Sequence, residues 1–266
     1  MRLAIVSDEI SRDFSTAVEL GVEWGIRTFE IRGLRTGRIP EVAEWEIRDL
    51  SAVNEQFGIT ISALSPGVFK VPIAAAETAH QLRETLPKSY ELAHRLGTDR
   101  VIIFGGRREE GVEQKAALPR VVDLLRQAVE EAERAGIRLL LENEPICWAD
   151  TGQAAAEIIR QVSHPHLRLN WDPGNSFHAG GRPYPDEYEG LKDLVGHLHI
   201  KDERRREGRC ETVALGEGEV DWRGQLAALR RDGFDGYYTV ETHYGPRVMA
   251  SRVCWENLRR MLLEIY

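Results

Sequence analysis

The sequence is poor in cysteine, in long apolar runs and in excess positive charge. Its three cysteines are an odd number without the close spacing of metal or redox motifs, so no disulfide framework is expected. No window approaches the roughly 18 to 20 apolar residues that cross a bilayer. Lys and Arg number 35 against 43 Asp and Glu, and the resulting net charge of −8 argues against a nucleic-acid or anionic-membrane partner.

The first nine residues read as a short strand followed by acids, and they lack the long apolar region of a signal peptide. Together with the unpaired cysteines, this start predicts a cytoplasmic protein. A small molecule is the expected partner, and the sequence leaves a homo-oligomer open.

Short apolar runs alternate with longer amphipathic runs along the chain, which is typical of βα units around a parallel sheet. The apolar runs predict strands at residues 2–7, 28–32, 59–64, 100–104, 137–142, 167–172, 196–201 and 236–241. The helices expected between and after them cover residues 14–24, 40–57, 74–96, 112–135, 153–162, 222–231 and 248–265. Pro87 should kink or restart the third helix. Residues 173–190 and 202–218 are expected to be long loops, the first with at most a short helix.

Eight strands, each followed by a helix or a long crossover, match the size of one (β/α)8 TIM barrel over residues 1–266. No linker that would split the chain is visible. The alternative is an open doubly wound sheet, which usually carries a Gly-rich phosphate turn after its first strand. Ser7, Asp8 and Glu9 follow the first strand instead, so the barrel is the predicted fold.

Four of the predicted strands carry potential metal ligands at or near their ends. Glu142, Asp172 and Glu241 each occupy the last position of a strand, and His199 lies near the end of another. Active sites of such barrels lie at the C-terminal ends of the strands, so we expect these four side chains to converge on one divalent ion. Three carboxylates and an imidazole suit Mg²⁺ or Mn²⁺ and also admit Co²⁺, Zn²⁺ or Fe²⁺. Taken singly, each acid could instead be solvated or, as for Asp172, cap a helix.

The strand that carries His199 has one polar face and one apolar face. Side chains alternate along a strand, so His197, His199 and Lys201 point to one side while Leu198 and Ile200 point to the other. His197 lies deeper than His199 and is expected to be a hydrogen-bonded interior group. The same parity places further polar residues inside the barrel: Asn170, Thr239, Tyr237, Glu30 and Arg32. Such groups must satisfy one another or a ligand.

Five short motifs carry a family resemblance that extends over essentially the whole chain. They are Leu-Glu-Asn-Glu-Pro around Glu142, Trp-Asp-Pro-Gly-Asn at Asp172, His-Leu-His-Ile-Lys-Asp at His199, Leu-Gly-Glu-Gly-Glu-Val-Asp-Trp from Leu215, and Val-Glu-Thr at Glu241. The chain thereby resembles the xylose-isomerase-like superfamily of sugar phosphate isomerases and epimerases. The resemblance implies a metal-dependent carbohydrate isomerase or epimerase in which Glu142 and Glu241 both bind the metal and move protons. One glutamate would remove the proton next to a ketose carbonyl and the other would return one.

The substrate-binding residues depart in part from the ketose 3-epimerases of that superfamily. Those enzymes usually carry a histidine where this chain has Asn175, with His178 the nearest histidine, and a glutamate where it has Trp148. Their substrate arginine does have a match in Arg205. The departures disfavour a free ketose and admit an acid-sugar, inositol-derived or keto-glycoside substrate. The candidate substrate-binding residues are Arg205, His178, Asn175, Lys201, Arg32 and His243.

The basic run at residues 204–206 could bind a phosphate or carboxylate, but such runs are most often solvated. Trp148, Trp171 and Phe177 are candidates for an apolar wall against a sugar face, although aromatic residues more often belong to the core.

Three other functions compete. A lyase, dehydratase or glycoside-cleaving enzyme could use the same metal to stabilise an enolate and expel a leaving group. A non-catalytic sugar-binding barrel would need no proton transfer. The abasic-site endonuclease branch needs extra histidine ligands, and the corresponding segments, residues 65–67, 105–107 and 210–212, contain none.

Overall fold

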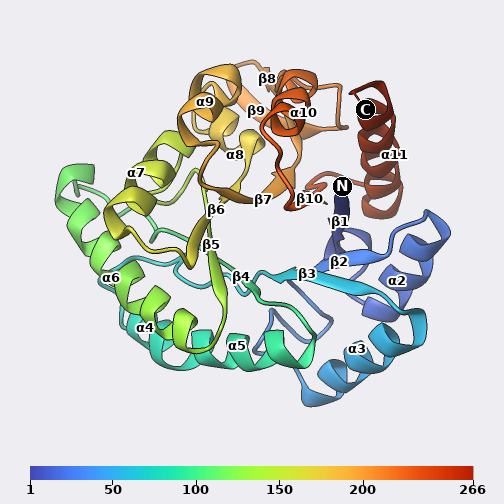
Figure 1. Cartoon of the computed structure of the whole chain (residues 1–266), viewed down its shortest axis with the longest axis horizontal. Helices are drawn as coiled ribbons and strands as arrows, with labels where there is room; N and C mark the ends of the chain where they lie inside the picture. Colours follow the sequence, from blue (N-terminus) through green and yellow to red (C-terminus); the bar gives the residue numbers. More distant parts are fainter. Residues whose placement is uncertain (266) are drawn as a thin grey trace.

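The chain forms a closed barrel of parallel strands with helices arranged around it (Figure 1). The computed structural model describes residues 1–265. Around the barrel the strands follow the order β1-β10-β7-β6-β5-β4-β3-β2. Their bounds are β1 Arg2–Val6, β2 Thr28–Ile31, β3 Thr60–Leu64, β4 Arg100–Ile103, β5 Arg138–Glu142, β6 Leu167–Trp171, β7 Val195–Ile200 and β10 Tyr237–Val240. The predicted TIM barrel is therefore confirmed.

Helices follow the strands along the chain. Their bounds are α1 Ser7–Ile10, α2 Phe14–Glu23, α3 Glu44–Phe57, α4 Ala76–His80, α5 Leu86–Arg95, α6 Gln114–Arg134, α7 Gly152–Val162, α8 Pro173–His178, α9 Tyr188–Leu191, α10 Trp222–Arg231 and α11 Arg247–Ile265. Two π-helical segments, η1 Gln81–Thr85 and η2 Pro183–Glu187, precede α5 and α9. The last helix, α11, contacts α1, α10 and β10 and so completes the ring of helices around the barrel (Figure 1). None of the described helices is long and apolar enough to cross a membrane.

The third predicted helix is divided, as Pro87 suggested. Residues 76–95 form α4, η1 and α5 in succession, and Pro87 lies in the first turn of α5. The amide of Leu86 donates to the carbonyl of Gln81, so a wider π-helical turn precedes Pro87 and accommodates a residue that has no amide to donate.

The prediction of a loop over residues 202–218 was wrong. Its first part is an antiparallel hairpin of β8 Asp202–Arg206 and β9 Arg209–Val213. The connecting residues Glu207 and Gly208 both have positive φ, 50° and 76°, as a tight hairpin turn requires. The high charge of these strands hid them, because both faces of the hairpin are polar and no apolar alternation marks them.

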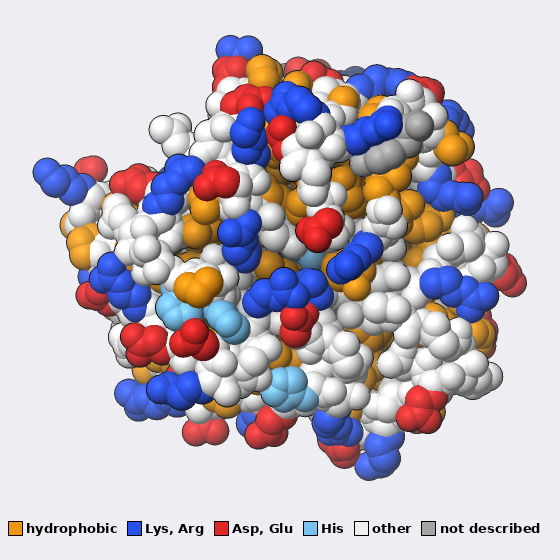
Figure 2. Space-filling view, viewed as in Figure 1, with side chains coloured by type: hydrophobic (Ala, Val, Ile, Leu, Met, Phe, Trp, Pro, Cys, Tyr) orange, Lys and Arg blue, Asp and Glu red, His pale blue; other side chains and the backbone are white. Residues whose placement is uncertain are grey.

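The core has an outer and an inner part. Apolar strand residues such as Leu139, Leu141 and Leu198 point outward into the layer between the strands and the helices. A small separate cluster of Ala63, Ile102 and Leu140 fills part of the interior of the barrel. Polar side chains occupy the rest of the interior and are completely buried, among them Glu30, Asn170, His197 and Thr239. On the face shown in Figure 2, basic and acidic side chains lie side by side.

Candidate active site

Four potential metal ligands from four neighbouring strands meet at one end of the barrel. Glu142 is the last residue of β5, Asp172 directly follows β6, His199 lies in β7, and Glu241 directly follows β10. Each offers a ligand atom, and these atoms all lie within 4.8 Å of one another. All four side chains are buried, with at most 4% of any residue exposed. The structure thus brings together the four residues expected from the sequence.

Local hydrogen bonds fix the position of Asp172. Its Oδ1 accepts a hydrogen bond from the backbone amide of Asn175 at 2.8 Å and so caps α8. The side chain of Asn143 pairs with the backbone of Asp172 in both directions, at 2.8 and 2.9 Å. The helix cap and the inward-facing carboxylate are therefore two roles of one residue, since Oδ2 remains directed at the cluster.

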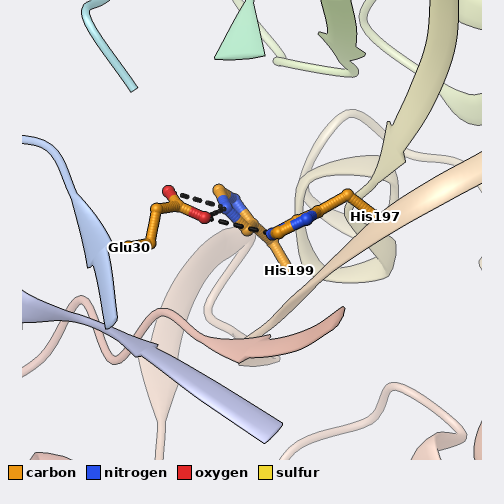
Figure 3. Close-up of side chains that lie close together, drawn as sticks. All are labelled: Glu30, His197 and His199. Atoms are coloured by element: carbon orange, nitrogen blue, oxygen red, sulfur yellow. Dashed lines mark hydrogen bonds and ion pairs between the residues drawn. The ribbon is translucent and has the colours of Figure 1, made fainter. Parts of the chain in front are cut away.

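The imidazole of His199 is held from behind by a buried carboxylate. Glu30 on β2 faces both His197 and His199 (Figure 3). Its carboxylate oxygens lie 3.0 and 3.1 Å from Nε2 of His199, and Oε2 lies 3.1 Å from Nε2 of His197. Nε2 of His197 also lies 2.9 Å from the hydroxyl of Thr239. The interior position expected for His197 is thus observed.

Because a carboxylate can only accept hydrogen bonds, Nε2 of His199 must carry the proton in this contact. Nδ1 of His199 then faces the cluster, 3.5 Å from Oε2 of Glu142 and 3.6 Å from Oε2 of Glu241. Nδ1 is buried and has no hydrogen-bond partner among the described residues.

Two cations neutralise Glu241, and both were candidates from the sequence. Nζ of Lys201 donates to Oε2 of Glu241 at 2.8 Å and to Oδ2 of Asp172 at 2.5 Å. Arg32 donates to Oε1 of Glu241 at 2.7 Å and to Oε1 of Glu9 at 2.6 Å. Lys201 is only 4% exposed, so its ammonium belongs to the cluster rather than to solvent.

The carboxylate of Glu142 is contacted by neutral amides, where the carboxylate of Glu241 is contacted by cations. Nδ2 of Asn170 donates to its Oε2 at 3.1 Å, and Nδ2 of Asn175 lies 3.3 Å from its Oε1. The two glutamates therefore differ, because one is bound by two amides and the other by an ammonium and a guanidinium.

This difference is reflected in their acidity. Burial would raise the pKa of Glu142, but the charges of His199 and Lys201 hold that pKa below its usual value. The pKa of Glu241 is held well below its usual value, because His243, Lys201 and His199 together outweigh burial.

The pKa values of the two basic groups in the cluster are raised. Burial would lower the pKa of His199, but Glu30, Glu142 and Glu241 raise it well above its usual value. Burial would likewise lower the pKa of Lys201, and its contacts with carboxylates raise it. Glu30 itself has a pKa lowered to about 2, since the two histidines outweigh its complete burial.

The donor set fits a divalent cation. Three carboxylates offer hard oxygen atoms, and Nδ1 of His199, which faces them, would offer one nitrogen atom once it gives up its proton. Glu30 behind Nε2 completes the arrangement found at many metal sites, in which a carboxylate orients a ligating histidine.

The structure separates the candidate substrate-binding residues into two groups. Asn175, Lys201 and Arg32 contact the cluster directly, and Nε2 of His243 lies 3.2 Å from Oε1 of Glu241. His178 and Arg205 have no contact with the four potential ligands. Nδ1 of His178 lies 3.7 Å from Oε2 of Glu203, and the guanidinium of Arg205 covers the ring of Phe177 at 4.8 Å from its centroid.

Two aromatic candidates belong to the core instead. Trp171 is fully buried and its Nε1 donates to Gln225, and Trp148 is 3% exposed. Trp171 follows the inward Asn170 in β6, so its side chain points outward, away from the barrel interior.

Some residues of the site were not identified from the sequence. Asp8 and Glu9 in α1 bind Arg32, and Asn143 links β5 to β6. Asp8 and Glu9 follow a strand end, and Asn143 directly follows Glu142, so strand-end position was the signal available for all three.

A turn beside the site is organised by one acid. Oδ2 of Asp202 accepts hydrogen bonds from the amides of Gly216 and Gly218, and Oδ1 accepts from Glu203 and Val220. The Leu-Gly-Glu-Gly motif is therefore folded around a buried carboxylate, and Asp221 caps α10.

Comparisons with known proteins agree with the barrel fold. The chain is 29% identical over 175 residues to a putative hydroxypyruvate isomerase of Homo sapiens, covering 62% of this chain and 60% of that protein. It is 25% identical over 111 residues to a 3-dehydroshikimate dehydratase of Bacillus anthracis, covering 42% of this chain and 39% of that one. In both cases the match spans less than two thirds of the relative's length.

Among solved structures, the IOLI protein, whose crystal structure is described as binding a zinc atom, superposes with a TM-score of 0.81. The alignment covers 100% of this chain and 98% of that chain at 21% identity, so it shows a shared fold. A family model matches residues 18–262, which is most of the chain. The protein therefore belongs to the xylose isomerase-like TIM barrel family.

Proposed function

We propose that the protein is a divalent-metal-dependent isomerase or epimerase of a sugar or sugar derivative. The observation that carries the proposal is the difference between Glu142 and Glu241, two buried carboxylates beside one potential metal site. Proton removal next to a carbonyl, followed by proton return, can be carried out by two such carboxylates placed beside the same carbonyl group. Relatives named as an isomerase, an epimerase and a dehydratase support enzymatic activity of this general kind.

A divalent ion held by Glu142, Asp172, His199 and Glu241 would polarise the substrate carbonyl and offset developing negative charge. Mn²⁺, Mg²⁺, Co²⁺ and Zn²⁺ are the candidates, since all accept oxygen and nitrogen ligands.

In the mechanism we propose, Glu142 removes the proton from the carbon next to the carbonyl. Its two amide neighbours leave it more basic than Glu241, whose charge is already neutralised by Arg32 and Lys201. Glu241 takes up a proton from solvent and returns it to the substrate, on the opposite face for epimerisation or at the adjacent carbon for isomerisation, and Glu142 releases the abstracted proton to solvent. Asn175, Lys201 and Arg32 lie close enough to bind substrate hydroxyl groups beside these carboxylates.

Hydrogen exchange in D₂O tests the proposal independently of the net reaction. Chelated protein is reloaded with each of the four metals and offered a panel of keto-sugars and sugar acids, and NMR follows deuterium next to the carbonyl. With saturating metal, we expect Glu142→Gln to slow exchange at least about 100-fold. Glu241→Gln should retain exchange but lose conversion to product.

Glu46→Gln is the matched control. Glu46 is also a buried glutamate, but it accepts hydrogen bonds from the backbone of Arg35 and Thr36 and has no contact with the cluster. Absence of exchange with every metal and every ketone, in protein that remains folded, would refute the proposal.

A dehydratase is the second candidate function, favoured by the position of Lys201. Its buried ammonium could protonate a leaving hydroxyl after the same proton removal. The two reactions differ in product, because elimination forms water and a conjugated double bond that absorbs ultraviolet light. Mass spectrometry of the product separates them. A product with the same mass as the substrate supports the isomerase, and a product lighter by one water molecule supports the dehydratase.

A further inference from the structure

The loop that follows β2 carries an arginine to the rim of the barrel. Residues 33–38 fold back on themselves through a bridge between Gly33 and Arg38, and the amide of Leu34 donates to the carbonyl of Gly37 at 2.9 Å. Leu34 and Ile39 anchor the loop, since both are buried in the core at 2% and 1% exposed. The backbone of Arg38 is therefore fixed on both sides.

The side chain of Arg38 is also held in place. Its Nε donates to the carbonyl of Ser65 at 3.0 Å, and Nη2 lies 3.2 Å from the hydroxyl of Ser65. Ser65 is the residue directly after β3, at the end of the barrel where the candidate active site lies. Gly67 makes room for the guanidinium, because a Cβ at Gly67 would lie 2.8 Å from Nε. Arg38 as a whole is exposed, but these contacts hold its guanidinium against the end of β3.

Arg38 differs from its neighbour Arg32 in having no counter-ion. Arg32 pairs with Asp8, Glu9 and Glu241. Across residues 1–265, no acidic side chain forms an ion pair with Arg38, and its Nη1 donates no hydrogen bond. A fixed cation with a free donor edge thus lies at the mouth of the site.

The surrounding charges show that this guanidinium belongs to the same electrostatic centre. The pKa of Arg38 is lowered by burial and by the positive charge of Arg32, while Glu142, Asp8 and Glu241 act in the opposite direction. An anion placed against Arg38 would give this guanidinium the direct ion-pair partner that it lacks among the described residues.

We propose that Arg38 is an anion-binding subsite for a carboxylate or phosphate group on the substrate, separate from the residues that move protons. The guanidinium fork matches both groups, and both accept hydrogen bonds from Nη1 and Nη2 together. The inference rests on the proposed function and narrows it to acidic hydroxy-ketones.

Three small ketones test the charge requirement. Hydroxypyruvate, dihydroxyacetone phosphate and dihydroxyacetone share a hydroxymethyl ketone and differ in carrying a carboxylate, a phosphate or a neutral group. With Mg²⁺-loaded protein, exchange in D₂O is expected to be faster for the charged ketones at equal low concentration. Arg38→Ala should lower kcat/KM for the favoured anion about 10- to 100-fold, mainly through KM, with dihydroxyacetone unchanged. The charged ketone with the higher kcat/KM shows whether the subsite binds a carboxylate or a phosphate.

Arg35→Ala is the matched control, because Arg35 lies in the same loop but pairs with Asp13. It should change none of the three rates, and Arg38→Lys should restore part of the lost rate. An equal loss for charged and neutral ketones in Arg38→Ala, or preference of the wild type for dihydroxyacetone, overturns the subsite.

Calorimetric titration with tartronate, a dicarboxylate without a ketone, gives a readout that needs no turnover. Weaker binding of tartronate to Arg38→Ala than to the wild type supports the subsite. If in addition no ketone exchanges hydrogen in D₂O, the subsite stands and only the proposed function fails. Equal tartronate affinity in the two proteins refutes the subsite, whatever the exchange rates.

Discussion

Oε2 of Glu30 on β2 lies 3.0 Å from Nε2 of His199 on β7, across the interior of the barrel. Neither side chain is more than 1% exposed, so no water competes for this contact. The carboxylate keeps the proton on Nε2 and leaves Nδ1 directed at Glu142 and Glu241. Glu30 thereby fixes the orientation of His199 and also raises its pKa.

Glu30→Gln is expected to weaken metal binding about 10- to 100-fold, because a neutral amide orients His199 less strongly and lowers its basicity. Titration calorimetry with Zn²⁺ measures the affinity, and side-chain ¹⁵N NMR of the histidines reports which nitrogen carries the proton. Glu46→Gln, at a buried glutamate outside the cluster, should bind Zn²⁺ like the wild type. Unchanged affinity and an unchanged tautomer in Glu30→Gln would show that the contact is dispensable.

The same residue should make the metal-free protein sensitive to acid. Burial opposes ionisation of Glu30, but His199 and His197 lower its pKa from 4.5 to about 2. A lowered pKa stabilises the folded state above pH 4.5, and this contribution of about 3 kcal/mol is lost as the pH falls towards 2.

The free energy of unfolding of the wild type should therefore fall faster than that of Glu30→Gln below pH 4.5. Between pH 6 and pH 3 the difference between the two proteins should shrink by about 2 kcal/mol. Urea denaturation at several pH values measures it. Parallel pH profiles for the two proteins would contradict the pKa assigned to Glu30.

Lys201 and a divalent ion are expected to stabilise the same carboxylates. Lys201→Met removes the ammonium that contacts Asp172 and Glu241 and leaves their buried charges without that partner. The metal-free variant should lose about 3–5 kcal/mol of stability. Because a bound cation replaces the missing charge, added Zn²⁺ should raise the melting temperature of the variant more than that of the wild type. Calorimetric melting with and without Zn²⁺ tests this, and an equal rise in both proteins would argue against shared carboxylates.

The fold and the four potential ligands were predictable because their signals are local. Strand ends, periodicity and caps such as Thr151 and Asp221 are each decided within a few residues. The geometry at His199 followed from strand parity, which also placed Glu30 in the barrel interior.

The partners of these groups were less accessible to sequence reasoning. That Glu30 contacts His199 rather than another interior group depends on the arrangement of β2 opposite β7 around the barrel. Arg38 and Ser65 meet only because the loop after β2 folds back, which no periodicity encodes. The hairpin of β8 and β9 was missed because its charged strands lack an apolar face.

A substitution in the turn around Asp202 tests how much the hydrogen bonds to this buried carboxylate contribute to stability. A Cβ at Gly218 would lie 2.1 Å from Oδ1 of Asp202 and 2.6 Å from the carbonyl oxygen of Glu203, so Gly218→Ala must displace the buried carboxylate or the backbone. Displacement breaks some of the hydrogen bonds from Gly216, Gly218 and Val220 to Asp202, and we expect a loss of about 2 kcal/mol or more.

Gly190→Ala is the matched control for this substitution. Gly190 lies in α9, a Cβ there meets nothing within 4 Å, and alanine favours the helix, so its effect should be neutral or stabilising by up to about 1 kcal/mol. Urea denaturation compares the two variants, and hydrogen exchange of β8 and β9 localises the damage. Because Asp202 also begins β8, faster exchange in Gly218→Ala should be concentrated in the hairpin that carries Arg205. Equal stability of the two variants would mean that the turn accommodates the added Cβ without loss of stability. Asp202 would then not hold the hairpin in position.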